Sequence, residues 1–424
     1  MSKSVFDLLK NAFYSLILST ISLTSVAQNT IIKAGHLFDS KRGKFLDNQV
    51  IIVKEGRVLQ IGSNLKYDKN DIVIDLSQSW VLPGLMDCHV HITSTYAFRK
   101  YSGMHGIYST ESSAFRALRG AHNAELLLRS GFTTIKDIGN DANYATADVI
   151  KAIQEGWVKG PTILYSGKII APYGGQTQGI SPESETVWQF EYLDADTNEE
   201  IIKAIRKNIY YGANAIKIVT GDQRYFYSEE NIRTAANEAH KAGLKLTCHV
   251  FEGEAARNVI MGGADAIEHG LFLSDSLLQL MKDKGVFLVG TDLTSDNFYA
   301  YGIDSAAANQ ISSRIIDRLK RAYKIGTKMA FGTDIIIDLP GKNRVESGLE
   351  ILKSWKAAGI PSSYILQTMT LYAGELLGVD KSRGVLQQDY LADIIAVRHD
   401  PIKDINAIKD VHFVMKEGVV IKHE

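Results

Sequence analysis

Residues 82–91 read LPGLMDCHVH, an apolar run that ends in two histidines separated by one residue. The apolar part has the composition of a buried β-strand. Side chains two apart on a strand face the same way, so His89 and His91 can offer two imidazoles to one metal ion. A His-X-His pair alone often occurs by chance or on a surface. Its place at the end of an apolar strand makes it a candidate site here.

Strand-like and helix-like segments alternate from about Trp80 to Val379, with helical periodicity at 229–242, 275–284 and 312–325. This alternation is typical of a parallel sheet with crossover helices. The predicted strands end near His91, Asp137, Gly167, Lys217, His249, His269, Thr291 and Asp334. Eight β/α units within the usual length range of that fold predict an α/β protein with a (β/α)8 TIM barrel. An open sheet is the alternative.

The two ends of the chain have a different pattern, with short strands separated by turns over about 30–76 and again over 393–421. Neither end has enough strands for a stable sheet, so we expect them to pair into one small β-sandwich. The predicted organisation is a signal peptide at 1–27, the N-terminal part of the sandwich at 28–80, the barrel at 81–383 and the C-terminal part of the sandwich at 384–424.

The first residues resemble an export signal. Lys3 and Lys10 make a basic start, residues 12–23 are mostly apolar, and Ser25-Val26-Ala27 places small residues before Gln28. The alternative is a membrane anchor, but the apolar run is shorter than the roughly 20 residues that a spanning helix needs. We therefore predict cleavage after Ala27 and a periplasmic or secreted protein without stable membrane insertion.

The charge of the chain is balanced, with 47 basic and 48 acidic residues. Such a balance provides no field to attract nucleic acid or an anionic membrane, and a small neutral or zwitterionic substrate fits better. A homo-oligomer is compatible with this composition. The two cysteines, Cys88 and Cys248, each precede a histidine on a predicted strand, so their side chains should point away from the site as buried free thiols.

Four further candidates lie at predicted strand ends: Lys217, His249, His269 and Asp334. Taken singly, each has a structural explanation, as a satisfied core histidine, a snorkelling lysine or a helix-capping aspartate. An ammonium at the mouth of a barrel, however, is costly unless it is paired or chemically altered. Together with His89 and His91 these residues end five different strands, and this barrel builds its active sites at that face.

With these motifs the sequence resembles the amidohydrolase superfamily over nearly all of its length after residue 27, including GFTTIKD at 131–137 and LADIIAV at 391–397. It is most similar to the branch that contains imidazolonepropionases and Xaa-Pro dipeptidase or acyl-amino-acid carboxypeptidase enzymes. The resemblance implies that His89 and His91 bind one divalent ion, expected to be zinc, and that His249 and His269 bind a second. It also implies that carbon dioxide carboxylates Lys217, which bridges both ions, and that Asp334 binds the first ion and moves protons.

The chemistry expected from this set is hydrolysis of an amide bond in a small substrate, such as a dipeptide or an N-acyl amino acid. A hydroxide shared by the ions would attack the carbonyl, with Asp334 and Lys217 as catalytic residues. Cyclic amides and esters are alternative substrates, and a deaminase or a catalytically inactive binding protein on the same barrel are further alternatives. The substrate contacts that we predict come from loops after the strands: Tyr173, Gln176, Arg224 and Tyr227.

Two departures from relatives bear on specificity. Imidazolonepropionase-type relatives lack a ligand lysine and use one metal, so Lys217 argues against that activity. Many relatives have a histidine after the paired glycines of the third-strand loop, where this chain has Gln176.

Overall fold

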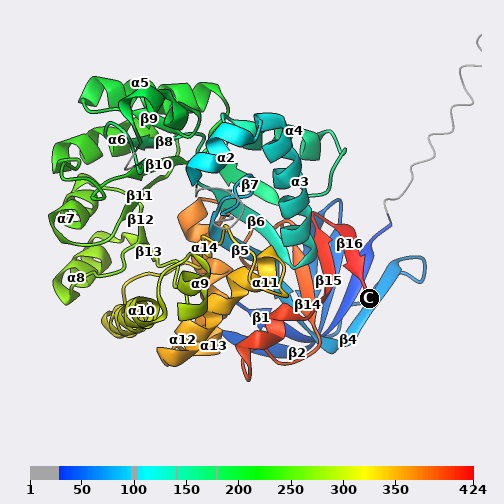
Figure 1. The fold of residues 1–424 in the computed structure, drawn as a ribbon. Coiled ribbons are helices and arrows are strands. Elements are labelled where there is room, and N and C mark those ends of the chain that lie inside the picture. Colours follow the sequence, from blue (N-terminus) through cyan, green and yellow to red (C-terminus); the bar gives the residue numbers. More distant parts are fainter. Residues whose placement is uncertain (1–27, 97–103, 140–141, 178–179) are drawn as a thin grey trace, which may run out of the picture.

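The computed structural model describes residues 28–96, 104–139, 142–177 and 180–424 (Figure 1). The predicted signal peptide at 1–27 lies outside the described residues. Within the described part of the chain, no helix combines the length and the apolar character needed to cross a membrane.

The two ends of the described chain meet in one sheet, as the strand patterns predicted. Its order is β16-β15-β14-β4-β1-β2-β3, and β14 pairs antiparallel with β4. The strands are β1 (Thr30–Asp39), β2 (Lys44–Lys54), β3 (Arg57–Gly62), β4 (Ile72–Pro83), β14 (Ile394–Val397), β15 (Val411–Lys416) and β16 (Val419–His423). The sheet curls until Arg57 of β3 pairs with Leu391, just before β14.

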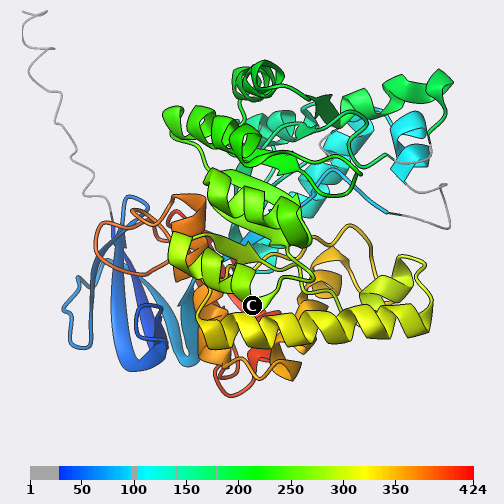
Figure 2. The ribbon, with the colours of Figure 1, turned by 90° about the vertical axis from the view of Figure 1, so that its left-hand side faces the viewer.

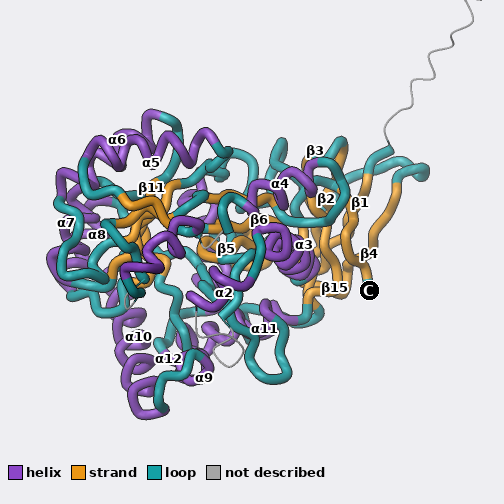
Figure 3. The backbone as a smooth tube through the Cα atoms, turned by 45° about the horizontal axis from the view of Figure 1, so that its top comes forward, coloured by secondary structure: helices purple, strands orange, loops and turns teal. Residues whose placement is uncertain are grey.

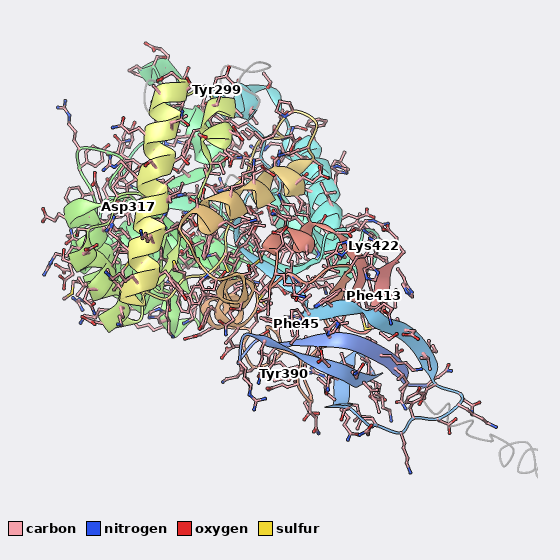
Figure 4. The ribbon with its side chains drawn as sticks, turned by 90° about the horizontal axis from the view of Figure 1, so that it is seen from below. Phe45, Tyr299, Asp317, Tyr390, Phe413 and Lys422 are labelled. Atoms are coloured by element: carbon pink, nitrogen blue, oxygen red, sulfur yellow. The ribbon has the colours of Figure 1, made fainter. Side chains whose placement is uncertain are left out.

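Alternation along the strands gives this sheet two buried faces. Ile394 and Phe413 belong to a core enclosed by the curled sheet, whereas their neighbours Ile395 and Val414 pack with the barrel core. Figure 4 places Phe45 of β2 where the sheet meets the rest of the molecule, and its ring packs against Phe38. The sheet is therefore fixed to the barrel through shared apolar side chains.

The barrel is built from parallel strands in two hydrogen-bonded groups, β5-β6-β7 and β13-β12-β11-β10-β8-β9. The third barrel strand is interrupted, because β7 and β8 are separated by residues 166–168. The strands are β5 (Leu85–Val90), β6 (Phe132–Asp137), β7 (Thr162–Tyr165), β8 (Ile169–Ala171), β9 (Tyr192–Asp194), β10 (Ile216–Val219), β11 (Leu246–Val250), β12 (Ala266–His269) and β13 (Phe287–Val289).

An extended segment at 329–331 takes the place of the eighth strand. Met329 forms a parallel bridge with Leu288 of β13, and the carbonyl of Phe331 accepts a hydrogen bond from the amide of Cys88 in β5 at 2.8 Å. These contacts join the last strand position to the first, so the predicted TIM barrel is confirmed.

Helices lie around the barrel strands, whereas the sheet formed by the two chain ends lies to one side (Figure 3). The predicted helices at 229–242 and 275–284 correspond to α6 (Glu229–Lys241) and α8 (Asp275–Lys284), and the side chain of Ser228 caps α6 by accepting a hydrogen bond from the amide of Asn231. The helix expected at 312–325 begins earlier, because the side chain of Asp304 accepts hydrogen bonds from the amides of Ala306 and Ala307. This long helix, α10, crosses the lower part of Figure 2.

The described helices are α2 (Met104–Thr110), α3 (Ser113–Arg129), α4 (Ala145–Gln154), α5 (Asn198–Tyr210), α6 (Glu229–Lys241), α7 (Gly253–Gly262), α8 (Asp275–Lys284), α9 (Ser295–Ala300), α10 (Ser305–Ile325), α11 (Arg344–Gly348), α12 (Leu352–Ala357), α13 (Ser362–Thr368) and α14 (Leu371–Leu377), with short 3-10 turns η1 (Pro182–Phe190), η2 (Leu349–Ile351) and η3 (Ile405–Lys409). Cys88 and Cys248 are buried and free, as predicted.

Candidate metal centre

Three side chains form a compact triangle where the first barrel strand, β5, meets the segment in the eighth strand position. Nε2 of His89 lies 3.2 Å from Nε2 of His91, and Oδ1 of Asp334 lies 3.3 Å and 3.1 Å from these two nitrogens. Neighbouring ligand atoms of a tetrahedral zinc site with bonds of about 2.0–2.1 Å are separated by about 3.3 Å. The triangle therefore has the dimensions of one face of a zinc coordination shell, and these residues fit a metal ion.

Both histidines are oriented through their other ring nitrogen. Nδ1 of His89 lies 2.7 Å from Oε2 of Glu268, and Nδ1 of His91 lies 2.8 Å from the carbonyl oxygen of Gly139. The carboxylate and the carbonyl accept hydrogen bonds, so each Nδ1 donates and each Nε2 keeps its lone pair for a ligand. Burial holds the pKa of His89 well below its ordinary value, which keeps the ring neutral as a metal ligand must be.

His269 and Asp334 reach the same centre because the backbone turns sharply at the strand ends. Both residues adopt positive φ, 68° and 51°, and so does Thr291 at 45°. Such angles are uncommon for residues with a Cβ and mark strain at functional sites. Thr291 then holds Nδ1 of His269 through a hydrogen bond of 2.8 Å. His89, His269 and Asp334 each offer a ligand atom within 4.8 Å of the others.

His249 extends the cluster away from the triangle. Its ring centroid lies 4.3 Å from that of His269, and its Nε2 lies 2.9 Å from Oδ1 of Asp222. Asp222 also accepts a hydrogen bond from Nε2 of Gln176 at 2.7 Å. Burial raises the pKa of the Asp222 carboxyl, but the contacts to His249 and Gln176 outweigh this effect and hold it below its ordinary value.

Lys217 lies on β10 between these groups, and its side chain is only 2% exposed. Burial lowers its pKa to about 8, an effect that the negative charges of Glu268 and Asp334 only partly offset. Its charge also acts on His89, His269 and Asp334. The structure therefore brings all six residues named from the sequence to one end of the barrel.

A second layer of buried polar groups lies behind the candidate ligands, and the sequence patterns did not predict it. Glu268 accepts hydrogen bonds from Lys136 Nζ, at 2.8 Å, and from Thr247, in addition to His89. The charge of Lys136 holds the pKa of Glu268 below its ordinary value, although burial acts in the opposite direction. Glu268 precedes His269 directly, and two-residue alternation would place the two on opposite faces. The positive φ of His269 breaks that alternation, so periodicity could not have found this pair.

The predicted substrate contacts separate into two groups. Tyr173 and Arg224 line a cleft of about 690 Å³ beside the centre, together with Trp188, Asp222 and Tyr225, and Gln176 lies near His249. Tyr227, in contrast, is buried, and its hydroxyl donates to the carbonyl oxygen of Ala195 at 2.6 Å. The position of Tyr227 in the core gives it a packing role, and the structure does not support it as a substrate contact.

Comparison with known proteins agrees with this geometry. The sequence profile of the Amidohydrolase family matches residues 80–421. The chain belongs to the amidohydrolase family. It is 26% identical to ochratoxinase from Aspergillus niger over 440 residues, covering 95% of this chain and 88% of that protein.

Solved structures of the family have the same architecture. A Xaa-Pro dipeptidase with bound methionine superimposes with a TM-score of 0.82 at 25% identity, covering 93% of this chain and all of that one. A prolidase complexed with N-methylphosphonate-L-proline gives 0.80 at 25% identity, covering 94% of this chain and all of that one. The amidohydrolase is thus a hydrolase of carbon–nitrogen bonds in small molecules, with a TIM barrel and an additional β-sheet domain.

Proposed function

We propose that this amidohydrolase is an exported two-metal enzyme that cleaves the amide bond of a dipeptide or N-acyl amino acid. The observation that carries the proposal is the triangle of His89, His91 and Asp334, with its edges of 3.1–3.3 Å. These three residues would hold the first ion. His249 and His269, whose rings are adjacent, would hold the second. We expect both ions to be zinc.

Lys217 would bridge the two ions as an N-carboxylated side chain. Its lowered pKa makes the neutral amine more accessible near neutral pH than it is in an exposed lysine. The lone pair of that amine would form a bond to the carbon of carbon dioxide while one C–O π bond opens to an anionic oxygen, and the nitrogen would release a proton to water to give a carbamate. The product is an anion with two oxygens, which replaces a buried ammonium that would repel the ions.

Asp334 would carry the proton between nucleophile and leaving group. When bound, the two ions lower the pKa of a water molecule to about 7 and polarise the substrate carbonyl. Oδ2 of Asp334 is 3.7 Å from His269, while Oδ1 faces His89 and His91, so the carboxylate spans the two halves of the centre. From there it can take a proton from water and give it to the departing nitrogen.

The cleft beside the centre supports a substrate with a ring and a carboxylate. Tyr173 and Tyr225 are about half exposed there, and the buried Trp188 also lines the cleft. Arg224 supplies a guanidinium that can bind a carboxylate through two hydrogen bonds. Because Asp222 joins this cleft to His249, a substrate in the cleft would present its amide to the metal centre.

A substrate panel with zinc-loaded protein tests the activity. We expect hydrolysis of dipeptides or N-acyl amino acids with a free carboxylate, and much weaker hydrolysis of the matching carboxamides. Arg224→Met should raise KM for the carboxylates by about tenfold or more, as loss of a charge-assisted hydrogen bond predicts. Arg233→Met on α6, which removes an exposed arginine that pairs with Glu229, is the matched control. Hydrolysis confined to cyclic amides or esters would contradict the proposed substrate class.

A further inference from the structure

The loop after β10 brings a carboxylate to the ring of His249. Asp222 follows β10 by three residues, and its Oδ1 lies 2.9 Å from Nε2 of His249, with side chains that are 14% and 8% exposed. Gly221, directly before it, has a φ of 93°, and a Cβ at this position would lie 3.3 Å from the Cβ of Ala255. Glycine takes such a backbone turn at little cost, whereas other residues are strained there. The turn therefore directs Asp222 toward His249.

The partners of Asp222 decide which atom carries the proton in this contact. An ionised carboxylate accepts hydrogen bonds and has no proton to donate, so Nε2 of His249 is the donor. Oδ2 of Asp222 accepts a second bond from Nε2 of Gln176 at 2.7 Å. The two nitrogens that share this carboxylate lie 3.5 Å apart. The neutral ring of His249 therefore keeps its lone pair on Nδ1.

We propose that Asp222 is a positioning residue for the second ion, an inference that rests on the proposed two-metal function. It holds the proton of His249 on Nε2, so the ring offers Nδ1 to the ion. His89 and His91 do the opposite, because the acceptors at their Nδ1 atoms leave Nε2 free. A separate acceptor thus sets the ligand nitrogen in each half of the centre.

Gln176 holds the carboxylate in the orientation that this role needs. Its Oε1 accepts a hydrogen bond from the hydroxyl of Tyr192 at 3.2 Å, which fixes the end of the amide that faces Asp222. Gly175 has a φ of 51° and lies against the ring of Tyr192, which a Cβ would approach to 2.6 Å. Both ends of the Gln176 amide are thus hydrogen-bonded within the protein, and Gln176 acts on the centre through Asp222.

Packing around the imidazole of His249 favours the same orientation. The centroid of the ring lies 4.7 Å from that of Phe251 and 4.3 Å from that of His269, each with the edge of one ring toward the face of the other. Rotation of the imidazole by half a turn would place a C–H where Nε2 now faces Asp222. The ring would then lose a hydrogen bond to a charged acceptor, which is stronger than a neutral one.

The tautomer can be measured in the zinc-free protein by NMR. In protein labelled with nitrogen-15 histidine at about pH 8, where an ordinary imidazole is neutral, the ring nitrogen that carries a proton is distinguished from the one with a lone pair. We expect His249 to be protonated on Nε2, and His89 and His91 on Nδ1. The variant His249→Gln assigns the signals of His249 by removing them. A His249 ring protonated on Nδ1 in the unaltered protein would overturn the inference.

Zinc titration measures the consequence for the second ion. Asp222→Leu removes both acceptor oxygens, so we expect the affinity for the second ion to fall about 10–100-fold while the first ion binds as before. Asp222→Asn keeps one acceptor oxygen and should lose clearly less affinity than the leucine variant. Glu252→Leu removes an exposed acidic side chain just after β11 and should change neither dissociation constant.

These measurements separate the positioning role from the two-metal function. A single ion in the unaltered protein would overturn the two-metal function and the role of Asp222 in it, even if His249 has the expected tautomer. Two ions bound equally well by Asp222→Leu and by the unaltered protein would overturn the positioning role alone. Equal losses in the leucine and asparagine variants would also overturn it, because the charge rather than the acceptor would then support the ion. Unchanged NMR signals of His89 and His91 in Asp222→Leu show that the variant is folded.

Discussion

Glu268 of β12 accepts a hydrogen bond from Nδ1 of His89 on β5 across the barrel interior, at 2.7 Å. The other oxygen of the same carboxylate accepts one from Lys136 of β6, at 2.8 Å. Glu268 thus fixes the tautomer of a histidine in the candidate metal centre and neutralises a buried lysine. The catalytic end of the barrel is supported by this interior network as well as by the strands themselves.

Replacing Glu268 by glutamine should therefore weaken both metal binding and folding. We expect affinity for the first ion to fall about 10–100-fold, because His89 loses the acceptor that orients it. The free energy of unfolding should fall by about 3–5 kcal/mol, because Lys136 is left as an unpaired buried charge. Zinc titration and urea unfolding measure the two effects. Glu254→Gln, on the exposed side of α7, is the control, and equal behaviour of both variants would contradict the role of Glu268.

Substitutions of Lys217 and of Asp334 should have different effects on metal binding and on turnover. Lys217→Ala should bind zinc poorly and be nearly inactive, because the ions lose their shared anion, and added short carboxylic acids should restore some activity. Asp334→Asn should keep both ions while turnover falls by roughly 10²–10⁴, the usual contribution of proton transfer. Metal analysis of the two variants measures the bound ions, and steady-state kinetics measures their turnover. Full activity of Lys217→Ala, or active protein without a carbamate signal after carbon-13 bicarbonate labelling, would exclude the bridging role.

Arg318 of α10 supports the centre from outside the barrel. Its Nη2 lies 2.8 Å from Oδ1 of Asp292, and both side chains are almost completely buried. Asp292 follows Thr291, which holds His269. Arg318→Met should lower the free energy of unfolding by about 3–5 kcal/mol, since it leaves a buried carboxylate without its partner. Lys320→Met, on the exposed face of the same helix, should stay within about 0.5 kcal/mol of the unaltered protein.

The predicted cleavage of a signal peptide can be tested on protein recovered after export. We expect the mature chain to begin at or near Gln28, because Ser25-Val26-Ala27 places small residues at the end of the apolar run. N-terminal sequencing of protein from outside the cytoplasm gives the answer. A membrane-bound protein that retains Met1 would contradict it.

The sequence by itself determined the barrel, the joining of the chain ends and the six residues of the candidate centre. Those features follow from local patterns: apolar runs of strand length, their alternation with helices, and polar residues where each strand ends. The parallel topology then places His89, Lys217 and Asp334 at one end of the barrel without any knowledge of contacts, because the carboxyl ends of all its strands meet there.

Only the tertiary structure decided which other groups face that centre. Glu268 and Lys136 are distant in sequence from His89 and meet it only inside the closed barrel. Asp222 reaches His249 because the loop after β10 folds over the end of β11. Tyr227 lies outside the site, because its hydroxyl donates a hydrogen bond to the carbonyl oxygen of Ala195 in the core. Local periodicity predicts the direction of a side chain on its own strand, whereas its partner depends on how distant segments pack.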